Sequence, residues 1–194
     1  YGEEFTDLID HNYPCQEDYQ DMMDGVDTLI ANGTVDPERL YVTGGSGGGI
    51  LTAWIVTKTD RFKAAVSQKP VINWATMAYT SDAYMYFSSY WFSDAPWNPK
   101  EMAEYVRRSP LTYVDKVKTP TMLMTGEQDY RTPITEAEQF YQALQLRKVD
   151  TMMIRVPDSS HSIASKPSRI MAKVGHVLAW FAEYGGEAID DKGK

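Results

Sequence analysis

Hydrophobic residues follow two alternating patterns along the chain, one typical of helices and the other typical of short buried strands. Apolar side chains at steps of three and four predict helices over residues 16–32, 134–146 and 167–184, and an apolar run predicts a buried helix over residues 50–57. Short β-prone runs predict strands over residues 40–43, 63–67, 121–125 and 151–156. Because short apolar strands that alternate with helices form parallel βαβ units, this order predicts an α/β fold.

Three of the predicted helices carry an apolar face that should be buried. On the helix at 134–146 this face comprises Ala137, Phe140, Tyr141 and Leu144. On the helix at 16–32 this face comprises Tyr19, Met22, Met23, Val26, Leu29 and Ile30. On the helix at 167–184 it comprises Ile170, Val174, Leu178, Trp180 and Phe181. The stretch between residues 69 and 115 is less regular and rich in aromatic side chains, so we expect helical excursions that cover one end of the sheet.

The composition narrows the class of protein. The chain has 194 residues, of which 43% are hydrophobic, which is enough for the core of one folded domain and excludes a disordered chain. A formal net charge of −8 argues against nucleic acid or an anionic membrane as a partner. No apolar run approaches the roughly 18 residues of a membrane-spanning helix. The single cysteine, Cys15, excludes an internal disulfide and leaves the compartment open between cytoplasm and periplasm.

A glycine-rich motif surrounds Ser46. Residues 44–48 fit the pattern G-x-S-x-G and lie between a predicted strand and a predicted helix, which is the context this motif requires. A serine on such a sharp turn has a strained backbone, and its neighbours approach other backbone closely, which glycine tolerates. A flexible glycine loop is the structural alternative, and a phosphate-binding loop is disfavoured because no Gly-Lys-Ser/Thr ending follows. We therefore interpret Ser46 as a nucleophile.

A serine nucleophile needs a neighbouring base, which is normally a histidine. Of the three histidines, His11 lies in a polar N-terminal stretch, and His176 lies inside the last predicted helix, where a surface or packing role fits better. His161 follows the strand predicted at 151–156, in a loop of small residues. Catalytic groups gather at the carboxyl ends of parallel strands. His161 is therefore the predicted general base.

The third member should be a carboxylate that orients the imidazole. Asp129 lies in the loop after the strand predicted at 121–125, and its rivals are Glu127 and Asp158. Asp158 is too close in sequence to the histidine to face it well. The order Ser46, Asp129, His161, each just beyond a different strand, is the chain order of the α/β-hydrolases. The sequence thus favours Asp129 as the acid.

These three segments together resemble the prolyl oligopeptidase family of serine peptidases, above all its bacterial acylaminoacyl-peptidase and dipeptidyl-peptidase-like members. The resemblance rests on residues 41–49, 125–133 and 157–161 and extends over nearly the whole chain. It implies an α/β-hydrolase fold and the hydrolysis of short peptides by acyl transfer, with release of aminoacyl or dipeptidyl units and with no cofactor. A carboxylesterase, which shares the triad, and an inactive proteolytic fragment of the peptidase are the alternatives.

The resemblance also implies how the chain is organised. Members of the family carry an N-terminal β-propeller and a complete hydrolase domain, whereas this chain opens at Tyr1 with no initiator methionine and no signal-peptide pattern. We therefore expect residues 1–194 to be the C-terminal portion of the peptidase domain, without the upstream strands and the propeller. Gly47 then supplies one backbone N–H of the oxyanion hole. An exposed edge on the strand at 40–43 should be covered by another chain, as a homo-oligomer or a swapped assembly.

Substrate contacts follow from the resemblance alone. It places Arg131 where the family binds a carbonyl of the acyl-side peptide, although a surface salt bridge is the alternative. It places Trp74 and Tyr79 on an apolar wall of the specificity pocket, although a role in core or lid packing is the alternative. No cluster of Cys, His and Asp has metal-ligand spacing, so we expect no metal.

Overall fold

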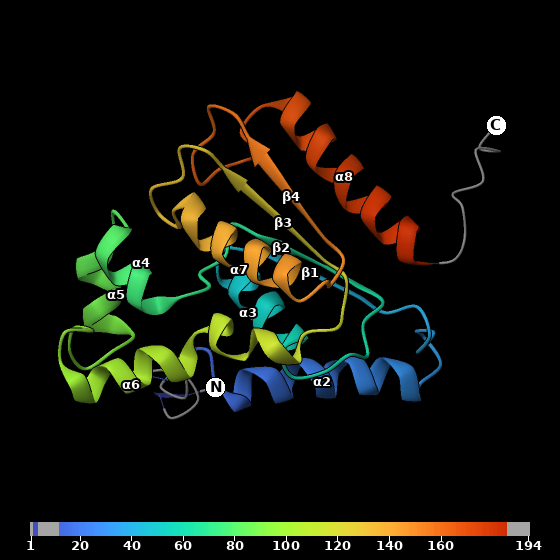
Figure 1. Cartoon of the computed structure of the whole chain (residues 1–194). Helices are drawn as coiled ribbons and strands as arrows, with labels where there is room; N and C mark the ends of the chain where they lie inside the picture. The colour runs from blue at the N-terminus through green and yellow to red at the C-terminus, as the bar shows by residue number, and fades with distance from the viewer. Residues whose placement is uncertain (1, 4–11, 186–194) are drawn as a thin grey trace.

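The computed structural model describes residues 2–3 and 12–185. Strands of one parallel sheet run through its centre, and their spatial order follows the chain (Figure 1). They are β1 (Tyr41–Gly45), β2 (Ala64–Gln68), β3 (Thr121–Gly126) and β4 (Thr151–Val156). All the predicted strands are present, with ends shifted by at most two residues. The predicted α/β class is confirmed.

Helices occupy both faces of this sheet and one of its ends (Figure 1). In chain order they are α2 (Gln16–Ala31), α3 (Gly47–Val56), α4 (Trp74–Thr80), α5 (Tyr84–Tyr90), α6 (Pro99–Arg108), the 3-10 helix η2 (Pro110–Lys116), α7 (Ile134–Leu146) and α8 (Pro167–Gly185). The excursion expected between residues 69 and 115 is helical, as predicted, and comprises α4, α5, α6 and η2.

The alternation of side chains along β2 divides the core between the two faces. Ala65 packs with residues of α3 and α7, including Ala53 and Phe140. Its neighbour Val66 packs on the opposite face, in the cluster that contains Trp180 of α8. Because both faces are covered, every residue of β2 and β3 is buried, as is typical of parallel sheets.

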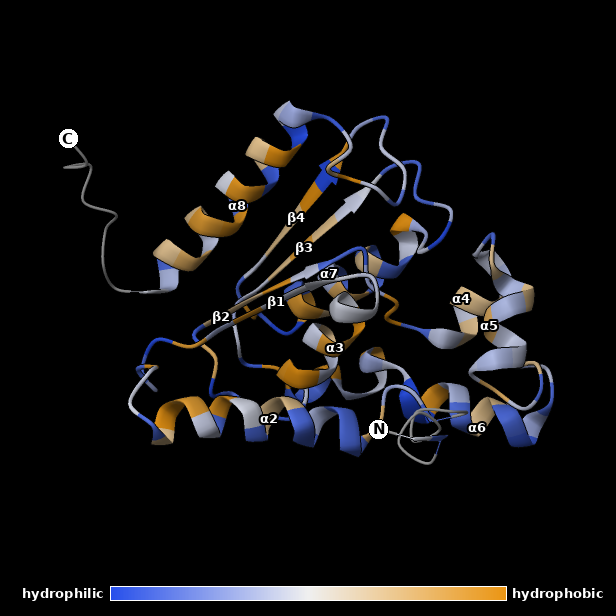
Figure 2. Cartoon of the chain, turned by 180° about the vertical axis from the view of Figure 1, so that it is seen from behind, coloured by the Kyte–Doolittle hydropathy of each residue, from blue (hydrophilic) through white to orange (hydrophobic). Residues whose placement is uncertain are grey.

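The apolar faces of two helices are only partly buried, which differs from the sequence expectation. On α2, Met23 is buried, but Met22 is 50% exposed and Leu29 is 43% exposed. These two exposed residues are seven positions apart, so they lie on one flank of the helix, beside the buried stripe. Hydrophobic residues run along α8 (Figure 2), and those that remain about half exposed are Ile170, Val174 and Leu178. Of the predicted face of α8, only Trp180 is buried.

β1 is an edge strand within the part of the chain that the structure describes. It pairs with β2 alone, in a parallel register that aligns Gly45 with Gln68. Its residues are intermediate or exposed, in contrast to the fully buried β2. The edge predicted on this strand is therefore present.

A buried arginine ties the helical excursion to the start of the described chain. Arg108, at the end of α6, donates hydrogen bonds to the carbonyl oxygens of Tyr13 at 3.3 Å and Trp91 at 2.6 Å. Its guanidinium also lies 3.7 Å from the ring centre of Phe92. Burial lowers the pKa of Arg108 to about 10, so the group remains charged at neutral pH. This cation holds together the aromatic segments that flank the site described below.

The close approach of two loops gives a test of the fold. A Cβ on Gly126 would clash with the carbonyl oxygen of Ser159, in the loop after β4. We expect Gly126→Ala to lower the free energy of unfolding by roughly 1–3 kcal/mol, because backbone must move to make room. Urea unfolding measures the change.

Gly175→Ala is the matched control, because the Cβ it would add in the middle of α8 has no atom within 4 Å apart from its chain neighbours and the nearby backbone of the helix itself. This variant should be neutral or more stable by up to about 1 kcal/mol, since alanine favours the helix. Equal stability of Gly126→Ala and the wild type would contradict the close approach.

Candidate active site

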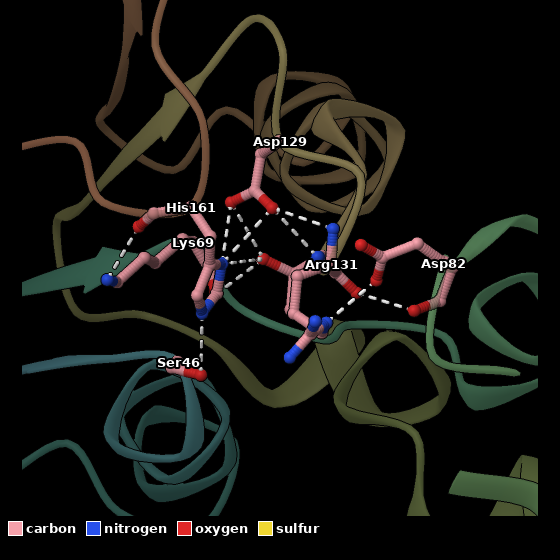
Figure 3. A network of polar contacts seen from close by, with 8 residues as sticks. Ser46, Lys69, Asp82, Asp129, Arg131 and His161 are labelled. Atoms are coloured by element: carbon pink, nitrogen blue, oxygen red, sulfur yellow. Dashed lines mark hydrogen bonds and ion pairs between the residues drawn. The ribbon is translucent and has the colours of Figure 1, made fainter. Parts of the chain in front are cut away.

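The carboxyl ends of three parallel strands bring together the side chains that the sequence singles out. Ser46 follows β1, Asp129 lies after β3, and His161 lies after β4. Nε2 of His161 lies 3.0 Å from Oγ of Ser46, and Nδ1 lies 2.8 Å from Oδ2 of Asp129. Figure 3 shows the imidazole between the hydroxyl and the carboxylate. A serine, a histidine and a carboxylate in such contact can activate the serine hydroxyl as a nucleophile.

Ser46 lies on a strained turn between β1 and α3. Its φ of 60° and ψ of −118° fall in a region that side chains rarely adopt, and its N–H donates a hydrogen bond to the carbonyl of Gln68 at 3.0 Å. A Cβ on Gly44 would clash with the backbone of Gly48, and one on Gly49 would clash with the Gln68 carbonyl. The crowding expected from the motif is therefore real, and glycine relieves it.

Asp129 is buried and held by its own loop. Its Oδ1 accepts hydrogen bonds from the backbone N–H groups of Arg131 at 3.0 Å and Thr132 at 2.9 Å, and the Thr132 hydroxyl lies 3.1 Å from Oδ2. Burial raises the pKa of the Asp129 carboxyl, but hydrogen bonds from His161 and Thr132 outweigh it and hold this pKa below its usual range. The carboxylate therefore stays ionised at neutral pH and can stabilise an imidazolium.

The rival acids and bases lie elsewhere. Glu127 forms an ion pair with an arginine on β4, and Asp158 is exposed. His176 is exposed on α8, as a surface role predicts. His11 lies outside the described residues. The acid and the base that the structure brings together are thus the two that the sequence favours.

A cavity of about 300 Å³ opens beside Ser46. Apart from the serine, Gly47 and Thr132, its lining is apolar and consists of Tyr13, Ile50, Val71, Trp74, Phe87 and Trp91. Trp74 is 1% exposed and meets the ring of Phe87 edge-on. The structure therefore places Trp74 on the wall of the cavity that Ser46 also lines.

Tyr79 does not reach this cavity, which corrects the expectation for that residue. It is 57% exposed and lies in a separate hollow with Tyr84, Met85 and Trp97. The reason is helical geometry: five positions separate Tyr79 from Trp74 on α4, so their side chains point about 140° apart.

Arg131 lies at the rim of the site, on the loop that carries the acid. Its Nε donates to Oδ1 of Asp82 at 2.7 Å, and both side chains are 49% exposed (Figure 3). An ion pair this exposed contributes little to stability. The guanidinium is therefore available to a ligand that competes with Asp82.

Sequence reasoning missed three residues that contact the site. Besides Thr132, these are Tyr13, whose hydroxyl donates to the carbonyl of Gly47 at 2.7 Å, and Lys69, whose Nζ donates to the carbonyl of His161 at 2.7 Å. Thr132 follows the acid so closely that position alone could have suggested it. The other two lie 34 and 92 residues from their partners, so no local pattern pointed to them.

The first turn of α3 offers a donor to an anionic oxygen. Gly47 is the first residue of this helix, where N–H groups have no carbonyl partner within the helix.

Among residues 2–3 and 12–185, no group of three or more His, Cys, Asp or Glu side chains could hold a metal ion. In the same part of the chain, no helix has the length and apolarity needed to cross a bilayer.

Similar proteins match nearly the whole length of this chain. The model of the prolyl oligopeptidase family matches residues 1–188. The uncharacterized peptidase YuxL of Bacillus subtilis is 36% identical over 187 residues, which cover 95% of this chain and 28% of that protein. The acylamino-acid-releasing enzyme of Arabidopsis thaliana is 30% identical over 191 residues, which cover 95% of this chain and 25% of that protein.

A solved structure shows the same fold. The uncomplexed acylaminoacyl peptidase of Pyrococcus horikoshii superposes with a TM-score of 0.87 at 28% identity, over 98% of this chain and 31% of that one. The chain thus spans between 25% and 31% of the length of these relatives. The match of the family model over residues 1–188, on a partial α/β-hydrolase fold, shows that the chain belongs to the prolyl oligopeptidase family.

Proposed function

We propose that this chain carries the reacting centre of a serine peptidase that hydrolyses short peptides. The observation that carries the proposal is the continuous line of polar contacts from Ser46 through His161 to Asp129. The names of the relatives support the same activity, since one is a peptidase and another an acylamino-acid-releasing enzyme. Release of an aminoacyl or dipeptidyl unit from the N-terminus of a short peptide is the reaction we propose.

The geometry supports acyl transfer in two steps. Oγ of Ser46 attacks the carbonyl carbon while Nε2 of His161 takes its proton, and Asp129 stabilises the imidazolium through Nδ1. The imidazolium then protonates the leaving amine as the C–N bond breaks, which leaves an acyl group on Ser46. Water, deprotonated by His161, hydrolyses this ester and regenerates the serine. The N–H of Gly47 stabilises the oxyanion in both steps.

The neighbouring side chains support a role in binding the acyl side of the substrate. An apolar side chain enters the cavity lined by Trp74, and Arg131 exchanges Asp82 for a carbonyl oxygen of the peptide. Removal of an apolar side chain from water into such a cavity stabilises the complex. Tyr79 has no part in this cavity.

Two further proposals and one alternative concern the whole protein. The short share of the relatives that the chain spans supports residues 1–194 as the C-terminal portion of a larger peptidase. The edge of β1 supports association with another chain, as a homo-oligomer or a swapped assembly, because an unpaired strand edge can bind a further strand. A carboxylesterase shares the triad, and comparison of a p-nitrophenyl ester with an aminoacyl anilide distinguishes it from the peptidase.

Removal of the nucleophile or the base should abolish reaction with a fluorophosphonate probe. In Ser46→Ala the attacking oxygen is gone, and in His161→Ala no base removes its proton, so we expect no labelling in the first variant and a loss of at least about a hundredfold in the second. Intact mass and peptide mapping measure the modification. Ser160→Ala, which changes an exposed serine of the histidine loop, should label like the wild type. Labelling at any other serine would overturn the assignment.

Replacement of the acid should separate activity from stability. We expect Asp129→Asn to lower the labelling rate roughly a thousandfold or more, because the amide favours the wrong imidazole tautomer. The depressed pKa of Asp129 contributes stability that is present above its unfolded value of about 3.8 and is lost as pH falls through the folded value. The stability gap between wild type and variant should therefore be widest at neutral pH and shrink in acid.

Glu127→Gln is the control for this prediction, because Glu127 lies in the same loop and pairs with Arg155 instead of His161. It should keep the wild-type labelling rate. Loss of activity in Glu127→Gln together with normal activity in Asp129→Asn would move the acid to Glu127.

The apolar lining of the cavity should make the protein prefer substrates with an apolar side chain on the acyl side. Anilides with phenylalanine or leucine on the acyl side should have a kcat/KM at least about tenfold above those with glutamate or lysine, because burial of a charge is unfavourable. We expect Trp74→Phe to narrow this preference, while Tyr79→Phe, in the separate hollow, should leave it unchanged. An equal response of the two variants would rule out the assigned wall.

A further inference from the structure

Lys69 occupies a backbone conformation in which a lysine is unexpected. It follows the last residue of β2 and has a φ of 40°, in the left-handed region that favours glycine. A side chain at such a position costs free energy that glycine would avoid. A lysine at this position therefore indicates that its side chain makes a contribution that glycine could not make.

The side chain runs from the end of β2 across the nucleophile turn to the histidine loop. A Cβ on Gly45, the residue before the serine, would lie 3.3 Å from Cε of Lys69, so the stem of the lysine crosses the space that this glycine leaves open. At its end, Nζ donates a hydrogen bond to the carbonyl oxygen of His161 at 2.7 Å (Figure 3). Hydrogen bonds from a charged donor are stronger than neutral ones.

The backbone at the same place contacts the other two catalytic segments. The carbonyl of Gln68 accepts the N–H of Ser46 at 3.0 Å, and the carbonyl of Lys69 lies 3.0 Å from the hydroxyl of Thr132 in the acid loop. The N–H of Lys69 donates to Met124 of β3 at 2.6 Å. The end of β2 therefore contacts the turn that carries Ser46, the loop that carries Asp129 and the loop that carries His161. It contacts the last of these through the lysine side chain.

Hydrogen bonds from the acid loop and from α8 hold the first residues of the histidine loop. The N–H of Gln128 donates to the carbonyl of Ser159 at 2.9 Å. Arg169 of α8 donates to the carbonyl of Pro157 at 2.7 Å and to that of Asp158 at 3.2 Å, which holds the start of the loop. Within residues 2–3 and 12–185, Lys69 is the donor that reaches the carbonyl of His161 itself.

We propose that Lys69 is a positioning residue that ties the main chain of His161 to the end of β2 and so keeps the imidazole aligned between Ser46 and Asp129. The proposal rests on the proposed function of the triad. Lys69 takes no part in proton transfer. Its contribution is geometric, and displacement of a base by about 1 Å can lower a rate a hundredfold.

Substitutions at Lys69 separate this role from a contribution to stability. Lys69→Met removes the ammonium and keeps the stem, Lys69→Gly also relieves the left-handed φ, and Lys69→Arg restores a cationic donor. We expect the rate of Ser46 labelling by a fluorophosphonate to fall roughly tenfold to a hundredfold in the Met and Gly variants, with partial recovery in the Arg variant. With an anilide substrate, kcat should fall while KM stays unchanged.

Lys148 is a matched control. It has a φ of 59° at the exposed end of α7, so Lys148→Gly relieves the same kind of backbone strain far from the site. Both glycine variants should keep the wild-type melting temperature or exceed it, and only Lys69→Gly should lose activity. Wild-type labelling rates in Lys69→Met and Lys69→Gly would overturn the proposal, as would a loss of rate that merely follows a loss of stability.

A readout that needs no activity distinguishes this proposal from the proposed function. Backbone amides of residues 158–166 should exchange with deuterated water faster in Lys69→Met than in the wild type, while Lys148→Met should leave them unchanged. Unchanged exchange in Lys69→Met would overturn the proposal that Lys69 holds the main chain of His161 in place. Faster exchange together with no labelling of the wild-type Ser46 would instead overturn the proposed peptidase chemistry. The role of Lys69 in holding the main chain of His161 would still be supported.

Discussion

Backbone hydrogen bonds between β3 and β4 run in parallel register from Thr121 and Thr151 to Gly126 and Val156. Because the strands end together, the loop with the acid and the loop with the base emerge at one edge of the sheet. β1 ends at the same edge, where Gly45 is aligned with Gln68 of β2. The contacts that join Ser46, His161 and Asp129 depend on this parallel alignment, since Ser46 and His161 are 115 positions apart in the chain.

Close backbone approach is the second constraint, and it follows from the first. Strand ends that meet at one edge crowd the turns that leave them, and three glycines occupy places where a side chain would strike main-chain atoms. They are Gly44, Gly49 and Gly126. Ser46 cannot be glycine without loss of its hydroxyl, so it carries the strain of a φ of 60°. Strain of this kind persists where the surrounding structure holds the backbone in place.

A buried carboxylate connects the acid loop to the wall of the cavity. Glu136, in the first turn of α7, accepts hydrogen bonds from the backbone N–H groups of Ile72 at 2.9 Å and Asn73 at 2.7 Å, just before Trp74. Burial raises the pKa of Glu136, because the charged form loses its hydration. Hydrogen bonds from the two amides and from Thr76 offset part of that loss. The segment that forms the apolar wall is thereby held against the helix that follows the acid.

The sequence by itself determined the strands and the helices over 16–32, 50–57, 134–146 and 167–184, and it singled out Ser46, Asp129 and His161. Each of these inferences depends on short-range signals: the apolar period, the glycine motif, and the position of Asp129 and His161 just beyond a strand. The sequence did not determine which flank of α8 is buried or that Tyr79 points away from Trp74. Nor did it identify Tyr13 and Lys69, which reach the site from distant segments. Those features depend on how elements pack in three dimensions. A side chain's partner across 92 residues is decided by that packing, and no pattern among its neighbours in the chain encodes it.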